Sequence, residues 1–169
     1  SGLTIGTTYY VRVHTYSTGN NATFDICVKT PPPPPSNDIC TGAIEITETT
    51  TCTPQTFDTY GATDNNETGD CVTGTENSVW FKFTALTTSA TVKVVGSSSF
   101  DAVIAALVNC GNSTRPTGGS CTDLYGDGLS ETMSLTGLIV GNTYYIQVHD
   151  YNGDVTSTST FTICVYSPL

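Results

Sequence analysis

The sequence predicts an all-β protein, folded as a jelly-roll-like β-sandwich of about eight strands. Three observations support this class. β-Branched and aromatic residues alternate with polar ones over short runs, as in half-buried strands. Gly, Asn and Ser bound these runs every ~8–15 residues, which is the spacing of a sandwich or jelly roll. No window of twelve residues carries the apolar stripe of a helix.

We expect strands near 43–47, 55–60, 78–84, 90–95, 102–108, 132–135, 143–149 and 160–165. Alternation assigns the faces of each strand, because successive side chains point to opposite sides. In the seventh strand, Tyr144, Ile146 and Val148 then face the core. Tyr145 and Gln147 are expected on the opposite, wetter face.

The chain contains an internal repeat. Residues 1–16 match residues 136–151 at nine of sixteen positions, and residues 23–28 match residues 160–165. The period of 135 residues is far above the ~20–50 residues of a solenoid, so each repeat should be a whole domain. We therefore interpret residues 1–30 as the C-terminal hairpin of a preceding repeat.

A proline run divides the chain after this hairpin. Pro31 to Pro35 favour polyproline II, a stiff spacer that rises ~3.1 Å per residue. We assign 31–36 as a linker, 37–166 as one complete β-sandwich repeat, and 167–169 as the start of the next linker.

Charge and hydropathy exclude two classes of partner. The chain has 5 Lys and Arg against 15 Asp and Glu, a formal net charge of -10, and lacks the basic stripe that nucleic acid requires. No apolar run approaches the ~18 residues of a membrane span, so membrane insertion is not expected.

Seven cysteines in a Thr- and Ser-rich chain indicate an oxidising compartment, and we predict a secreted or cell-surface protein. The sequons at Asn21, Asn66 and Asn112 are candidate glycosylation sites on such a surface.

The complete repeat keeps six cysteines, which allow fifteen pairings. We expect the short loop closures Cys110–Cys121 and Cys52–Cys71, which leave Cys40–Cys164 to join the first strand to the last. Cys27 is the counterpart of Cys164, and we expect its partner in a preceding copy.

Several motifs carry a family resemblance. They are Asn-Asp-Ile-Cys at 37–40, Ser-Val-Trp-Phe-Lys-Phe at 78–83, Ser-Phe-Asp-Ala-Val at 99–103, and Gly-Asn-Thr-Tyr-Tyr-Ile at 141–146. In this order they resemble the pre-peptidase C-terminal-like domains repeated along secreted and surface proteins of Bacteroidetes-type bacteria. The resemblance implies a jelly-roll-like sandwich, export that is often by the type IX route, and a non-catalytic accessory, adhesive or structural role. Some relatives bind calcium.

Calcium is the one cofactor that the sequence predicts. Asp123 and Asp127 lie on a Gly-bearing loop, and Asn37 and Asp38 at the domain entrance are expected to converge on it. Calcium takes six to eight oxygen ligands from such loops. The alternative is that these residues are ordinary turn formers, because Asp and Gly favour turns.

No catalytic centre is predicted. His14 and His149 occupy equivalent repeat positions, and no G-x-S-x-G or H-E-x-x-H motif frames a nucleophile or a metal. The outward tyrosines of the Tyr9-Tyr10 and Tyr144-Tyr145 pairs, together with Tyr16 or Tyr151, are candidates for stacking on sugars, with cross-strand aromatic pairing as the alternative.

These observations favour a non-enzymatic structural repeat of a secreted or cell-surface fibre or adhesin. Its partners would be copies of itself, either neighbouring repeats in one long chain or separate subunits joined by donation of strands or a hairpin from one copy to the next. The alternative is an accessory module of a secreted enzyme that binds surface glycans or protein.

Overall fold

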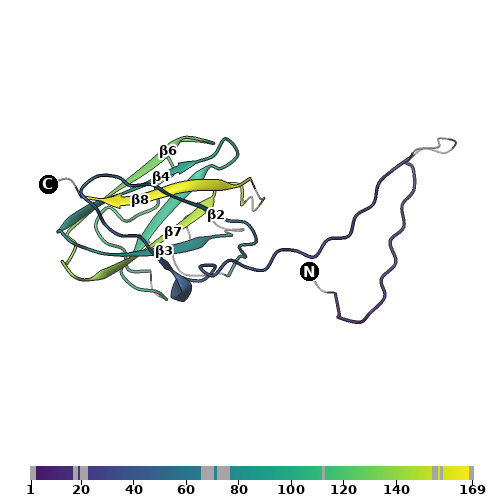
Figure 1. The fold of residues 1–169 in the computed structure, drawn as a ribbon, viewed down its shortest axis with the longest axis horizontal. Helices are drawn as coiled ribbons and strands as arrows, with labels where there is room; N and C mark the ends of the chain where they lie inside the picture. Colours follow the sequence, from purple (N-terminus) through teal and green to yellow (C-terminus); the bar gives the residue numbers. More distant parts are fainter. Residues whose placement is uncertain are drawn as a thin grey trace. The chain divides into compact units, whose positions relative to one another are not determined.

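The computed structural model describes residues 3–16, 19, 23–65, 71, 77–111, 113–153, 156 and 158–167. The chain separates into two compact units, Ser1–Thr30 and Pro31–Leu169. The larger unit is a β-sandwich (Figure 1). No helix among the described residues is long and apolar enough to cross a membrane.

The eight predicted strands are confirmed, with small shifts at their ends. After a single 3-10 turn, η1 (Cys40–Gly42), they are β1 (Ile44–Glu45), β2 (Gln55–Asp58), β3 (Val79–Thr84), β4 (Ser89–Gly96), β5 (Ala102–Leu107), β6 (Ser130–Thr136), β7 (Thr143–Asp150) and β8 (Thr160–Tyr166).

The strands form two four-stranded sheets, in the orders β1-β3-β7-β5 and β2-β8-β4-β6. β7 lies between β3 and β5 in the first sheet, and β8 lies between β2 and β4 in the second. The connection between the last two strands, β7 and β8, therefore crosses from one sheet to the other. β7 and β8 do not pair with each other, so our description of the repeat's last two strands as a hairpin is wrong.

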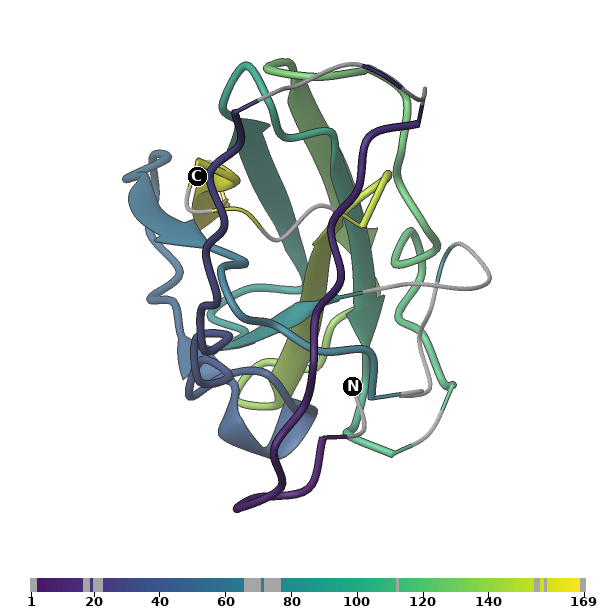
Figure 2. The same ribbon diagram turned by 90° about the vertical axis from the view of Figure 1, so that its right-hand side faces the viewer.

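The main core lies between the two sheets, which pack face to face (Figures 1 and 2). Alternation places the residues as expected in β4 and β6, where every second side chain is buried. The largest fully buried side chains in this core are Ile46, Phe81, Phe83, Phe100, Phe161, Ile104, Met133, Leu135, Ile146 and Ile163.

The outer face of the first sheet is also covered, which corrects the expected wet face of β7. Trp80 and Leu107 form a second small core there with Cys40 and Ala43. Gln147 is only 1% exposed, and its amide donates a hydrogen bond to the Ser78 hydroxyl at 3.1 Å. Alternation could not reveal this cover, because it comes from segments distant in the sequence.

The disulfides are Cys40–Cys110, Cys52–Cys164 and Cys71–Cys121. All three predicted pairings, Cys110–Cys121, Cys52–Cys71 and Cys40–Cys164, are therefore wrong. The prediction favoured short loop closures, whereas the observed bridges join residues 50 to 112 positions apart.

Sheet topology explains the observed pairs. β2 lies beside β8, which brings the segment of Cys52 next to Cys164. Cys40 and Cys110 meet in the small core around Trp80. Cys121 precedes Thr122, whose backbone pairs with Ile104 along the outer edge of β5.

The N-terminal unit consists of two extended stretches, 3–16 and 23–30, drawn in purple and dark blue (Figure 1). No strand pairing is found among the residues of this unit that the structure describes. Its large apolar side chains are exposed, namely Leu3, Ile5, Tyr9, Tyr10, Val11, Val13, Tyr16, Phe24, Ile26 and Val28.

Candidate functional sites

The N-terminal stretch has the local structure that the start of β7 has in the sandwich. The Thr4 N–H donates to the Tyr9 hydroxyl at 2.8 Å, and the Ile139 N–H donates to the Tyr144 hydroxyl at 2.9 Å. Gly6 has a φ of 82°, close to the 85° of Gly141. Each pair is related by the repeat offset of 135 residues, so the local conformation repeats with the sequence.

The histidine that ends each stretch repeats in the same way. His14 Nδ1 lies 3.0 Å from the carbonyl oxygen of Thr15, and His149 Nδ1 lies 3.0 Å from that of Asp150. This contact with the neighbouring backbone supports the structural interpretation of both residues.

Burial distinguishes the two segments. Tyr9 is 49% exposed against 4% for Tyr144, and Phe24 is 62% exposed against 2% for Phe161. The same difference applies to the pairs Val11 and Ile146, Val13 and Val148, Ile26 and Ile163, and Val28 and Val165. The N-terminal unit therefore exposes two apolar faces whose counterparts are buried in the sandwich core. The first face is formed by Tyr9, Val11 and Val13, and the second by Phe24, Ile26 and Val28.

Cys27 lies between Ile26 and Val28 in the stretch that carries the second of these faces, and alternation places it on the opposite side of that stretch. It is exposed and is the one free cysteine of the described residues. Its repeat counterpart, Cys164, is bonded to Cys52. In the complete repeat, the cysteine at the position of Cys27 is therefore bonded to Cys52, and not to Cys40 as we expected.

Asn37 and Asp38, at the start of the sandwich, are hydrogen-bonded to other segments of the domain. The Asn37 side-chain amide donates to the Trp80 carbonyl at 3.1 Å, and the Trp80 N–H donates back to the Asn37 carbonyl at 2.8 Å. The Asp38 carboxylate accepts the backbone N–H and the hydroxyl of Thr63, each at 2.7 Å, and the amide of Asn65 at 3.1 Å. Both entrance residues are buried and bonded to protein groups.

The proline linker contacts the sandwich. Pro32 and Pro35 are half-buried. A Cβ on Gly61 would lie 2.7 Å from the Pro33 carbonyl oxygen, so only glycine fits there. The proline linker therefore packs against the sandwich that follows it in the chain.

An acidic corner lies where β5 begins, and sequence reasoning did not identify it. We define it as Asp101, Asp123, Asp127, Glu131 and Asp150. The Asp150 carboxylate accepts the Asp101 N–H at 2.8 Å, so Asp150 caps the start of β5. The Glu131 carboxylate accepts the N–H groups of Leu124 and Tyr125 at 2.9 and 2.6 Å.

Two carboxylate oxygens in the acidic corner, Asp101 Oδ1 and Glu131 Oε2, are buried without a hydrogen-bond partner among the described residues. Burial, followed by the charges of Asp123, Asp127, Asp150 and Glu131, raises the pKa of Asp101 to about 6. Burial acts in this direction because it penalises the charged form of a carboxyl. The signal was hidden because Asp101 and Glu131 are 30 residues apart in the sequence.

Calcium stays a prediction. No hydrogen bond of the described residues joins Asn37 or Asp38 to Asp123 or Asp127. No group of three or more His, Cys, Asp or Glu side chains in the described part of the chain is arranged to hold a metal ion. Of the predicted ligands, only Asp123 and Asp127 share an electrostatic environment, in the acidic corner.

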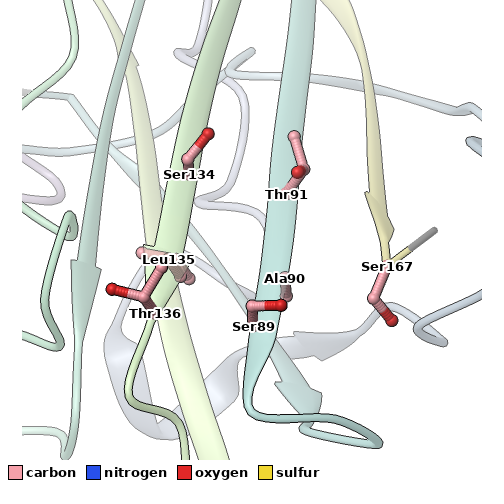
Figure 3. Close-up of a pocket in the computed structure, with 7 residues that line it drawn as sticks. All are labelled: Ser89, Ala90, Thr91, Ser134, Leu135, Thr136 and Ser167. Atoms are coloured by element: carbon pink, nitrogen blue, oxygen red, sulfur yellow. The ribbon is translucent and has the colours of Figure 1, made fainter. Parts of the chain in front are cut away.

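A shallow pocket of about 220 Å³ lies against the ends of β4, β6 and β8 (Figure 3). Five of its seven lining residues carry a hydroxyl group, and the lining comprises Ser89, Ala90, Thr91, Ser134, Leu135, Thr136 and Ser167. None of these described lining residues is aromatic, and the pocket is smaller than the ~300–1,000 Å³ of typical small-molecule sites.

The candidate sugar-stacking tyrosines are split by the fold. Tyr145 packs against the small core around Trp80, whereas Tyr151 is half exposed at the end of β7. They do not form one exposed strip on the sandwich. The candidate glycosylation sites Asn21, Asn66 and Asn112 lie outside the described residues.

The sandwich and its three disulfides define a class, that of extracellular β-sandwich modules stapled by cystines. A family model described as galactose binding domain-like and associated with T9SS, the type IX secretion system, matches residues 36–163. The chain belongs to this T9SS-associated, galactose binding domain-like family, and the predicted secretion of the protein is confirmed.

The chain is similar to several solved structures. Among them is the pre-peptidase C-terminal domain of a collagenase from Bacillus anthracis, with a TM-score of 0.42 and 10% sequence identity. The alignment covers 73% of this chain and 93% of that domain. No curated protein matches the chain. The finer resemblance to pre-peptidase C-terminal-like repeat domains stays a prediction.

Proposed function

We propose that this chain is a non-enzymatic structural segment of a secreted array of β-sandwiches, in which residues 1–30 complete a preceding sandwich. The observation that carries the proposal is the pair of unpartnered core faces on residues 3–28. Their apolar pattern, their turn and their local hydrogen bonds repeat those of β7 and β8.

The complete sandwich already contains all eight of its strands, which favours an array of sandwiches along one polypeptide over assembly from separate copies. In the complete repeat, β7 and β8 already occupy the central positions of the two sheets. A second copy of this chain therefore offers no vacant position, unless β7 and β8 are displaced and Cys52–Cys164 is broken. The sequence left two arrangements open, repeats of one long chain and polymerisation of separate copies, and the occupied central positions favour the first.

The position of Cys52–Cys164 suits a structural role under tension. Cys52 lies soon after the entrance of the sandwich, and Cys164 lies just before its exit. A force applied to the two ends of the sandwich is therefore transmitted through this disulfide, and the 112-residue segment between the two cysteines is not stretched.

Electron microscopy of the native material, released from the cell surface without reduction, tests this function. We expect rows of beads joined by short spacers. Single isolated globules would contradict the proposal.

The second candidate function is an accessory module that binds glycans or protein. Its support is the hydroxyl-lined pocket on β4 and β6, together with the galactose binding domain-like family. A pull-down on insoluble and immobilised polysaccharides tests it, with a variant in which Ser134→Leu and Thr136→Leu fill the pocket. Retention of the original protein together with loss of the variant would favour this module over the structural segment.

A further inference from the structure

The two halves of residues 3–28 correspond to strands in different sheets. Residues 9–14 match β7, which pairs with β3 on one side and β5 on the other. Residues 23–28 match β8, which pairs with β2 and β4. A sandwich that lacked these two strands would be divided within both sheets, into β1-β3 and β5 and into β2 and β4-β6.

We propose that residues 3–28 insert one central strand into each sheet of a six-stranded sandwich body, and that Cys27 forms a disulfide with the cysteine at that body's Cys52 position. This inference rests on the proposed function and deepens it, because it specifies the partner surface and the covalent bond. The partner is a body of this same fold, with open positions between the counterparts of β3 and β5 and of β2 and β4.

Burial supplies the driving force. Six side chains of the segment, Tyr9, Val11, Val13, Phe24, Ile26 and Val28, lose contact with water when they take the places of their counterparts. Burying aliphatic and aromatic side chains favours association, because it removes apolar surface from water. The strands also gain backbone partners on both edges, which an isolated extended segment lacks.

Local structure lowers the cost of insertion. The Tyr9 hydroxyl already accepts the Thr4 N–H, and the turn bond from the Thr7 N–H to the Thr4 carbonyl is formed at 3.1 Å. The same turn bond precedes β7, from Asn142 to Ile139 at 3.0 Å. The entry to the first strand is therefore preorganised before a partner is present.

The cysteine assignment follows from the strand positions. Cys27 precedes Val28 as Cys164 precedes Val165, and Cys164 is bonded to Cys52 beside β2. A strand seated in the β8 position places Cys27 against the same neighbour. An exposed thiol in a secreted, disulfide-bonded protein is free to form this bond.

The test is a fusion in which a second copy of residues 37–135 is placed directly before Ser1 of the full chain. Ser1 is the repeat counterpart of Thr136, so the join keeps the register of the repeat. We expect two folded sandwiches and no free thiol, where the original chain has one. Peptide mapping should find Cys27 linked to Cys52 of the added body, and amides of residues 9–13 and 24–28 should exchange slowly.

Two controls keep the result interpretable. In the first, residues 1–30 of the fusion are replaced by residues 136–166, which tests whether the added body folds with its own strands. In the second, Cys27→Ser should retain slow amide exchange and leave one free thiol on the added body.

The outcomes separate the two proposals. Slow exchange with Cys27 free, or bonded to another cysteine, would overturn the assigned disulfide and leave the array intact. Fast exchange in 9–13 and 24–28, with an added body that folds in the first control, would overturn both the strand insertion and the array.

Discussion

Tyr9 and Tyr144 form the same hydrogen bond in opposite environments. Each hydroxyl oxygen accepts the backbone N–H five residues upstream, at 2.8 Å from Thr4 and at 2.9 Å from Ile139. Tyr144 is buried in the sandwich, whereas Tyr9 is half exposed. Because the bond forms without the core, it is determined by the local sequence around the glycine turn.

This bond predicts the titration of Tyr9. The N–H of Thr4 stabilises the phenolate, which lowers the pKa of Tyr9. We expect Thr4→Pro, which removes the donor, to return the pKa of Tyr9 toward the ordinary value near 10. Thr4→Ala keeps the N–H but removes the Thr4 hydroxyl, which also lowers this pKa, so it should raise the pKa less than Thr4→Pro does. NMR titration of the tyrosine ring carbons measures both, and equal values in the two variants would contradict the role of this bond.

The acidic corner predicts a gain in stability from removing a charge. The pKa of Asp101 is raised from 3.8 to about 6 in the folded protein, so the folded state binds this proton more tightly than the unfolded chain. The resulting stabilisation is fully present below pH 3.8 and is lost as the pH rises through about 6.

We therefore expect Asp101→Asn to raise the Tm at pH 7.5, measured in chelator, and to have a smaller effect at pH 4. Glu45→Gln removes an exposed carboxylate and serves as the control, with little change at either pH. A lower Tm for Asp101→Asn at pH 7.5 would show that the carboxylate is stabilised by contacts other than those described.

The Cys52–Cys164 bridge predicts a short extension under force. When the full chain is pulled from its two ends, the oxidised sandwich should release little length, because this disulfide bypasses a loop of 112 residues. Reduction should add roughly 370–400 Å at ~3.3–3.6 Å per residue. Single-molecule force spectroscopy measures the difference.

Matched variants locate the effect. Cys71→Ser with Cys121→Ser should leave the oxidised length unchanged, because this bridge lies inside the bypassed loop. Cys52→Ser with Cys164→Ser should give an intermediate length, because Cys40–Cys110 still shortens the path. An intermediate length from the first variant would contradict the assigned connectivity.

The small core on the outer face of the first sheet predicts that truncating Leu107 lowers the stability of the sandwich, although this side chain points away from the main core. Leu107 is fully buried against Trp80, Cys40 and Ala43. Leu107→Ala should lower the free energy of unfolding by about 2–5 kcal/mol. Leu86→Ala, at an exposed leucine, should change it by less than about 0.5 kcal/mol. Denaturant unfolding compares the two, and equal effects would mean that the outer face is not a packed core.

Some of this could be predicted from the sequence because it is local. Alternation in 89–96 and 130–136 specifies which side chains face inward, since the side-chain period of a strand is fixed at two. The repeat of Tyr-Tyr and Cys positions was visible without coordinates, and so was a boundary at the proline run. The compartment followed from the cysteines, and the family confirms it.

Other features depend on which strands become neighbours. The partner of Cys52 is Cys164 because β2 pairs with β8, and nothing near either residue in the sequence encodes that pairing. The burial of Gln147 and the raised pKa of Asp101 arise in the same way, from loops that approach over long sequence distances.

The strands, the alternation of side chains within them, the repeat and the turn that Tyr9 and Tyr144 share could be read before any coordinates, because they depend on interactions within a few residues. The disulfide partners, the acidic corner and the placement of β7 and β8 in separate sheets emerged only from the folded arrangement of the chain. These require contacts between segments far apart along the chain, and the packing of the whole core selects among the many pairings that local preferences leave open.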